Sequence, residues 1–282
     1  MAPRAPKSRN REEVILAKPP LNEAWLEIRW KLHDTPEGLQ IDPGFPFALG
    51  TFYHGVKDRY AYRVDLDASR APQEMLPFVV RHQFRPGKEE WPVLQIGPGV
   101  ATVNLTRPYS WDLFLNEIRF LRDQLVEAYG DDPIKTDLIT LRYKNSEPFD
   151  YRTNDFLEFL RTRLNTELSL PGNVPGNFAS RPSPTSGRIR LSFDLARPKG
   201  TGALLLGTGT QTMEQDTLPH ARVKAEVLLW QLELASGGDD APNVYDESQF
   251  HSWLGDAHSV LHEWFFSLIE GALLQEYMDE GG

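Results

Sequence analysis

The stretch "LQIGPGVATVN" (residues 94–104) places Gly97, Pro98 and Gly99 between two runs of β-forming residues. A phosphate-binding loop would need three glycines in a G-x-G-x-x-G pattern or a Gly-Lys-Ser/Thr sequence, each opening a helix. The residues after Gly99 are instead typical of a strand. Proline followed by glycine suits the two central positions of a type II turn, because the second of them has a positive φ. We therefore predict a tight β-hairpin without a phosphate site.

The segments around this hairpin alternate between apolar and polar residues, with the period of two expected of half-buried strands. Residues 34–58, which include "DPGFP", carry turn-forming residues and are predicted to be a connecting loop. This part of the chain is therefore expected to form a meander of strands. The predicted strands are residues 24–32, 60–68, 78–86, 91–96 and 99–106.

Beyond the hairpin, the hydrophobic period changes from two to about 3.6 residues. Residues 110–130 carry an apolar stripe between the N-cap residue Ser110 and the C-terminal Gly130, which indicates an amphipathic helix. A strand over 136–145 and a second amphipathic helix over 154–168 follow. The remainder is predicted to form three strands and one long C-terminal helix, over residues 188–196, 202–210, 222–235 and 245–278.

This order of elements predicts an α+β fold with mainly antiparallel, curved sheet, two mid-chain amphipathic helices and a long C-terminal helix packed on the sheet. Residues 1–18 are predicted to be a disordered basic tail. Residues 19–282 are predicted to form a single domain. An open alternative is two similar halves, 19–168 and 188–282, joined by a Pro/Gly-rich loop or lid over 169–187. No sequence repeat supports that alternative.

Composition and charge exclude several kinds of site. The chain of 282 residues has no cysteine, which excludes disulfides, cysteine nucleophiles and thiolate-ligated metals. Its formal net charge of −10 disfavours nucleic-acid binding, because the phosphate backbone is repelled. No apolar run approaches the roughly 20 residues of a membrane-spanning helix, and the start lacks the apolar stretch of a secretory signal. We expect a cytoplasmic protein without a membrane segment.

The sequence contains no familiar catalytic constellation. His258 and His262 have the i, i+4 spacing of a metal-binding pair, but the glutamate follows the second histidine instead of the first. Histidines that flank an apolar stripe more often pack than bind a metal. A G-x-S-x-G nucleophile elbow is not found either. We therefore predict no catalytic residue, no metal and no cofactor, and favour a non-enzymatic role.

The segment "LRYKN" contains the strongest candidates for binding a small ligand. Alternation directs Arg142 and Tyr143 to opposite faces of a strand, so one of the two points inward. An inward arginine needs either a carboxylate of the protein or an anionic ligand. A structural ion pair is favoured. The alternative is a pocket for a small anionic ligand between the sheet and the C-terminal helix, formed by Tyr109, Arg142, Asn145 and His258.

Three parts of the chain together resemble a known family. They are "PPLNEAWLEIRW" (19–30), "LQIGPGVATVNLTRPYSWDLF" (94–114) with "LRYKN" (141–145), and "DAHSVLHEWFFSLIEGAL" (256–273). In order and spacing they resemble the sporadically distributed, functionally uncharacterised family of bacterial and archaeal proteins. Its members share a Pro-Pro-Leu start, a glycine-bearing hairpin before Tyr-x-Trp, an Arg-Tyr-x-Asn strand and a terminal Ala-His helix. Lys144 and Ser259 depart from the family pattern.

The family has no established enzymatic activity to transfer, and its patchy distribution implies a role in defence, toxin neutralisation or another conflict system. Together with the acidic charge and the aromatic C-terminal segment, this predicts a non-enzymatic accessory or immunity-type component that binds another protein or itself. Trp253 and Trp264 are the expected partner-surface residues, because exposed aromatic side chains are frequent hot spots. The alternative is that both pack on the sheet.

Overall fold

The computed structural model describes residues 16–130, 132–169, 186–215 and 218–279. Its strands are β1 (Leu21–Trp30), β2 (His33–Asp34), β3 (Gln40–Ile41), β4 (Tyr62–Asp65), β5 (His82–Arg85), β6 (Val93–Gly97), β7 (Val100–Leu105), β8 (Thr136–Pro148), β9 (Arg188–Ala196), β10 (Lys199–Gln215) and β11 (Leu218–Gly237). Within these ranges, nine strands form one sheet in the order β4-β5-β6-β7-β1-β8-β11-β10-β9, and each neighbouring pair is antiparallel. The predicted α+β class with an antiparallel sheet is confirmed.

The helices of the described ranges mostly begin at a capping side chain. They are α1 (Phe45–Val56), α2 (Trp111–Ala128), α3 (Phe156–Arg163), α4 (Glu247–Ile269) and α5 (Ala272–Met278), with short 3-10 turns η2 (Asp67–Arg70), η3 (Gln73–Met75) and η4 (Gly238–Asp240). Ser110, Asp155 and Asp246 accept hydrogen bonds from backbone N–H groups at the starts of α2, α3 and α4. Among these described helices, none has the length and hydropathy to cross a bilayer.

The sheet buries one of its faces, and the alternation along β1 shows which. Every second residue from Ala24 to Trp30 is at most 1 % exposed, whereas the residues between them are half-buried. Helix α2 contacts the sheet at β7, and α4 contacts it at β8 and β11. The buried residues of strands and helices belong to one hydrophobic cluster. The opposite face carries mainly polar side chains, such as Gln95, Asn104 and Arg142, as is typical of antiparallel sheets with one largely solvated side.

The hairpin predicted from "LQIGPGVATVN" is confirmed as the connection between β6 and β7. Gly97 pairs with Val100, so Pro98 and Gly99 form a two-residue turn. Gly99 has a φ of 76°, as a type II turn requires. The turn is buried. Its backbone groups are hydrogen-bonded within the protein: the N–H of Trp30 donates to the carbonyl of Gly99 at 3.1 Å, and the N–H of Gly99 donates to the carboxylate of Asp42 at 3.2 Å. The turn therefore belongs to the core and is inaccessible to a ligand.

The prediction of a connecting loop over residues 34–58 is wrong, because this segment contains α1. The buried residues of α1 recur at three- and four-residue intervals from Phe45 to Val56. Pro46 lies in the first helical turn, where the missing N–H costs no intrahelical hydrogen bond. The many glycines and prolines of this segment obscured its apolar stripe.

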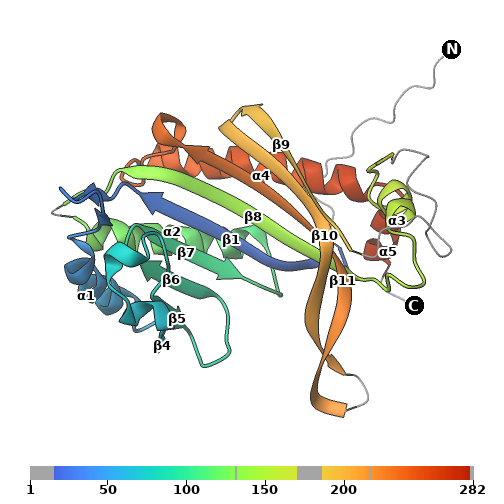
Figure 1. Ribbon diagram of the computed structural model, residues 1–282, viewed down its shortest axis with the longest axis horizontal. Helices are drawn as coiled ribbons and strands as arrows, with labels where there is room; N and C mark the ends of the chain where they lie inside the picture. The colour runs from blue at the N-terminus through green and yellow to red at the C-terminus, as the bar shows by residue number, and fades with distance from the viewer. Residues whose placement is uncertain (1–15, 131, 170–185, 216–217, 280–282) are drawn as a thin grey trace.

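The prediction of one long helix over residues 245–278 is also wrong. Helix α4 packs on the sheet but ends at Ile269, and α5 begins at Ala272. Gly271, between them, has a φ of 111°, a backbone conformation that residues with a Cβ rarely adopt. The break allows α5 to contact α3, at the end of the molecule opposite α1 (Figure 1).

The two halves considered from the sequence contribute different blocks to one sheet. Residues 19–168 supply β1 and β4 to β8, residues 188–282 supply β9 to β11, and the blocks meet where β8 pairs with β11. The blocks differ in strand number, and both contribute to the same core. Most of the predicted loop, 170–185, and residues 1–15 of the predicted tail lie outside the described residues. Lys18 is part of the fold, since its N–H donates to the carbonyl of Tyr277.

Strands β10 and β11 extend well beyond their neighbours. The pairing of β9 with β10 stops at Gly207, and the pairing of β8 with β11 stops at Val227. From there the hairpin continues as a two-stranded ribbon that projects from the body of the protein (Figure 1). We call residues 208–215 and 218–226 the arm.

Candidate functional site

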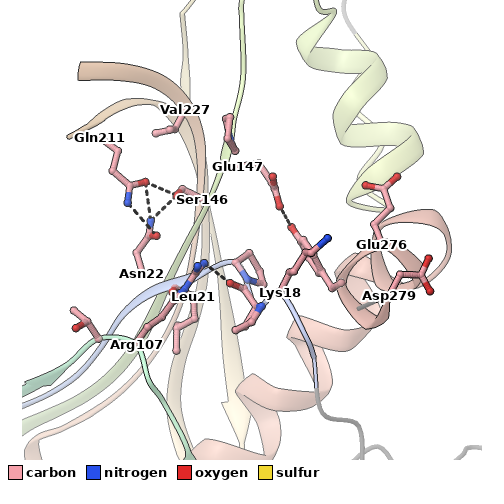
Figure 2. Close-up of a pocket in the computed structure, with 15 residues that line it drawn as sticks. Lys18, Leu21, Asn22, Arg107, Ser146, Glu147, Gln211, Val227, Glu276 and Asp279 are labelled. Atoms are coloured by element: carbon pink, nitrogen blue, oxygen red, sulfur yellow. Dashed lines mark hydrogen bonds between the residues drawn. The ribbon is translucent and has the colours of Figure 1, made fainter. Parts of the chain in front are cut away.

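A cleft of about 830 Å³ opens at the base of the arm. Segments that are distant in the sequence come together around it, as Figure 2 shows. They are the chain leading into β1, the residues after β7, the end of β8, the base of the arm, and α5. The lining residues are Lys18, Pro19, Pro20, Leu21, Asn22, Thr106, Arg107, Ser146, Glu147, Pro148, Gln211, Val227, Glu276, Tyr277 and Asp279.

Three uncharged polar side chains form a closed hydrogen-bonded ring on one wall of the cleft (Figure 2). The amide of Asn22 donates to the hydroxyl of Ser146 at 2.5 Å. That hydroxyl donates to the amide oxygen of Gln211 at 2.7 Å, and the amide of Gln211 donates back to Asn22 at 3.3 Å. Because the partners of Ser146 are amides, no strong base is placed to activate its hydroxyl as a nucleophile.

Charged groups of both signs surround this ring. The guanidinium of Arg107 donates through Nε to the carbonyl of Leu21 at 2.9 Å and through Nη2 to that of Pro19, which fixes the chain entering β1. On the other side, the carboxylate of Glu147 accepts a hydrogen bond from the hydroxyl of Tyr277. Burial raises the pKa of Glu147, and this hydrogen bond opposes the rise. The cleft therefore presents fixed donors and acceptors beside both a cationic and an anionic group.

Lys18 and Asp279 stand at the exposed rim of the cleft. The third acidic group, Glu276, forms an ion pair with Arg163 of α3. This arrangement suits a polar, uncharged or zwitterionic chain such as a peptide segment, whose amides can bond to Asn22 and Gln211. The lining residues contain no nucleophile paired with a general base.

Two of the sequence-predicted ligand residues lie together, but away from the cleft. The hydroxyl of Tyr109 donates to the hydroxyl of Tyr143 at 3.1 Å, which lies 2.9 Å from Nδ1 of His258. The imidazole of His258 stacks on the indole of Trp111, with ring centroids 3.9 Å apart. These side chains close the space between β8, the start of α2 and α4, so they form a packed cluster.

His258 is held neutral in this cluster. Burial, together with the smaller effect of the neighbouring His262, lowers its pKa to about 4. The neutral ring keeps one proton, and its Nδ1 shares a hydrogen bond with the hydroxyl of Tyr143, which also accepts from Tyr109. Within the described residues, no group of three or more His, Asp or Glu side chains is arranged to hold a metal ion.

This burial makes stability depend on pH. The unfolded chain protonates His258 near its ordinary pKa of 6.5, whereas the folded chain does so only near pH 4. The stabilising contribution is therefore complete above pH 6.5 and is lost as the pH falls towards 4. We expect urea unfolding of His258→Gln to depend less on pH between 7 and 5 than that of the wild type, because Gln does not titrate and its amide can still hydrogen-bond to Tyr143. Replacing the exposed His33 by Gln should leave the dependence unchanged, and equal slopes for all three proteins would contradict the assignment.

Arg142 lies on the opposite, polar face of the sheet. Its Nε donates to the carboxylate of Glu233 at 2.6 Å, and its guanidinium lies 5.0 Å from the ring centroid of Trp25. The predicted structural ion pair is thus confirmed. Asn145 is 1 % exposed and its amide donates to the carbonyl of Trp230 at 3.5 Å. The prediction that these four residues form a single pocket is therefore wrong. Strand β8 separates Arg142 from Tyr109 and His258, and the side-chain amide of Asn145 is already hydrogen-bonded to a main-chain carbonyl.

The two predicted partner-surface residues differ in their surroundings. Trp253 is 6 % exposed, and its indole N–H donates to Ser236 at 2.8 Å. Its placement on a partner surface is therefore wrong. Trp264 is half-buried and packs edge-on against Phe193 of β9, with ring centroids 5.4 Å apart.

Sequence reasoning does not identify the cleft. Pro19 to Asn22 and Arg107 lie in the segments that resemble the family, which is the one signal available from the sequence. Lys18 falls within residues 1–18, which the sequence predicts to be a disordered tail. Gln211 and Tyr277 reach the cleft only because the arm and α5 fold back to the same end of the sheet.

Comparison of the chain with protein-family models gives no match, and comparison with curated protein sequences and with solved structures gives no significant one. The resemblance to the sporadically distributed family therefore stays a prediction.

Proposed function

We propose that this chain is a non-enzymatic protein-binding component and that it recognises its partner with the cleft and the arm. The observation behind this proposal is that the arm leaves the sheet as a two-stranded ribbon, and that Gln211 of the arm and the adjoining Val227 line the cleft. An isolated two-stranded hairpin is marginally stable in water. A ribbon that projects this far therefore gains most from a partner that packs against it.

The chemistry of the cleft supports a peptide segment as the part of the partner that enters it. The ring of Asn22, Ser146 and Gln211 offers hydrogen-bonding groups at fixed positions, and main-chain amides of an extended segment match such groups. The rim charges of Lys18 and Asp279 would then select flanking charges of opposite sign. A role as an accessory or immunity-type component, as the family resemblance implies, agrees with this mode of binding.

The proposal predicts that reversing the charges at the rim of the cleft weakens partner capture. The double variant Lys18→Glu/Asp279→Lys reverses both rim charges without changing the net charge. We expect its capture of the partner from an extract of the native host to fall by about tenfold relative to wild type, because rim charges control encounter and orientation. Capture by the tagged full chain is quantified by mass spectrometry.

The matched control is Lys57→Glu/Asp58→Lys, an equivalent swap after α1, at the opposite end of the molecule. Circular dichroism establishes that both variants are folded. Equal capture by wild type, cleft variant and control would show that the cleft is not the binding site. If wild type specifically captures no protein, the protein-binding function itself is wrong.

A further inference from the structure

Strand β9 forms an open edge of the sheet. It pairs with β10 over all nine residues without a register shift, and in the described part of the chain nothing pairs with its other side. The sequence RIRLSFDLA alternates from Arg188 to Leu195, so apolar side chains point to the helix face and polar ones to the open face. Leu191 is 37 % exposed and Phe193 is 45 % exposed, although both are large and apolar.

Edge strands are normally protected against pairing with another chain by shortness, proline, a bulge or inward-pointing charge. The opposite edge follows this rule, because β4 has only four residues and carries the Arg63–Asp65 ion pair. Strand β9 has no proline and no bulge. It is therefore a ready template for another strand, and its sequence indicates which strand fits.

We infer that β9 pairs antiparallel with β9 of a second copy of this chain, across a two-fold axis at Ser192. This register overlaps all nine residues, and it places side chains of the same kind on the same face. A two-fold axis makes the contact isologous and closed, so it yields a dimer and not a fibre. The cross-strand pairs are Ser192 with Ser192, Leu191 with Phe193, Arg190 with Asp194, Ile189 with Leu195, and Arg188 with Ala196.

Charge complementarity favours a second copy over an unrelated strand. Each dimer would contain two Arg190–Asp194 pairs, with opposite charges directly across from one another. The side chain of Arg190 is 50 % exposed although it contacts Glu233 of its own chain, so its guanidinium can serve both carboxylates. Asp194 is exposed on the same face of the strand. Pairing would give this carboxylate a partner.

The apolar face supports the same arrangement. Phe193 packs against Trp264, whose ring lies over Gly202 so closely that a Cβ there would be 2.7 Å from it. Despite this contact, part of the Phe193 ring remains exposed, and so does the neighbouring Leu191. In the dimer, each Leu191 covers the partner's Phe193, and the half-buried Trp264 side chains extend the shared apolar surface. The partner surface predicted for Trp264 would thus be the interface with a second copy of the chain.

Sedimentation velocity over a range of concentrations tests this inference. We expect the wild type to be a reversible dimer, and Asp194→Arg to raise the dimer Kd at least about tenfold, because Arg190 then faces an arginine. The double variant Arg190→Asp/Asp194→Arg should lower the Kd again relative to Asp194→Arg, since it exchanges the two charges across the strands. It should not reach the wild-type value, because the aspartate introduced at position 190 then lies beside Glu233 of its own chain. The control Asp58→Arg makes the same charge change far from β9 and should leave the Kd unchanged.

A second measurement does not depend on these charges. Since the chain has no cysteine, Ser192→Cys introduces a single thiol next to its own symmetry mate. We expect mild oxidation to give a disulfide-linked dimer of Ser192→Cys, but not of Asp58→Cys. A wild type that is monomeric at every concentration, or a dimer that Asp194→Arg leaves intact, would overturn the inference. The rim variant Lys18→Glu/Asp279→Lys should still dimerise. Failure of the cleft proposal can therefore be distinguished from failure of the β9 dimer.

Discussion

Replacing Asp42 by alanine is expected to lower the free energy of unfolding by about 4 kcal/mol. The carboxylate of Asp42 is buried and accepts four hydrogen bonds from four separate parts of the fold. Its Oδ2 accepts from the indole of Trp30 at 2.9 Å, from the hydroxyl of Tyr129 at 2.9 Å and from the N–H of Gly99 at 3.2 Å. Its Oδ1 accepts from the N–H of Phe45 at 3.0 Å.

These contacts join the end of β1, the start of α1, the β6–β7 turn and the end of α2. Without the carboxylate, four buried donors lose their acceptor, and each unsatisfied donor costs about 1–3 kcal/mol, partly relieved by water entering the space. Burial and the adjacent carboxylate of Asp42 also raise the pKa of Tyr129, so its hydroxyl stays protonated and continues to donate.

Urea or guanidinium denaturation at neutral pH measures the loss. The matched variant Asp42→Asn keeps the shape and one acceptor oxygen, so its loss should be smaller than that of Asp42→Ala. A loss below about 1 kcal/mol for the alanine variant would mean that the four donors find other partners. The carboxylate of Asp42 would then not be what holds these four elements together.

Replacing Gly97 by alanine is expected to lower the free energy of unfolding by about 3 kcal/mol. A Cβ at this position would lie 2.1 Å from the carbonyl oxygen of Val79, which is backbone and cannot rotate away. The neighbours of Val79 are held by hydrogen bonds from the N–H of Phe78 to Pro98 and from the N–H of Arg81 to Ile96. The backbone must therefore separate here to admit one methyl group.

Gly255→Ala is the natural comparison for this variant. Gly255 lies on the exposed side of α4 with nothing within 4 Å of a Cβ. Alanine there should raise the free energy of unfolding by about 0.5–1 kcal/mol, because glycine is a poor residue in a helix interior. Chemical denaturation of both variants gives the two differences. Similar values for the two would show that the close approach of Val79 to Gly97 does not restrict the fold.

Local elements were predictable where their signals were complete within one segment. The β6–β7 hairpin could be predicted from Pro98 followed by Gly99, two adjacent residues. In the structure, Gly99 has the positive φ, 76°, that this turn requires. Helix α2 needs only its apolar stripe and the cap at Ser110. Helix α1 was missed because its glycines and prolines look like turn residues, and they are tolerated only because Phe45 to Val56 gain a core to pack against.

The candidate sites show the same limit. Alternation in "LRYKN" separated Arg142 from Tyr143, and the structural ion pair followed. Its partner Glu233 lies 91 residues further along the chain, and no local pattern names it. Tyr109 and His258 were both expected in a pocket, yet Trp111 and Tyr143 fill the space between them.

By itself, the sequence determined the α+β class, most of the strands, the mid-chain helices and the hairpin turn, because hydrophobic periodicity and turn chemistry act between residues close in the chain. Only the tertiary structure decided the strand order, the break before α5, the cleft and the open edge at β9. Each of these depends on which distant segments meet, and that choice is made by burial of the whole core and by backbone pairing over long separations. The self-complementary pattern of β9 is visible in the sequence. It indicates a candidate pairing site only because the structure places β9 at the edge of the sheet.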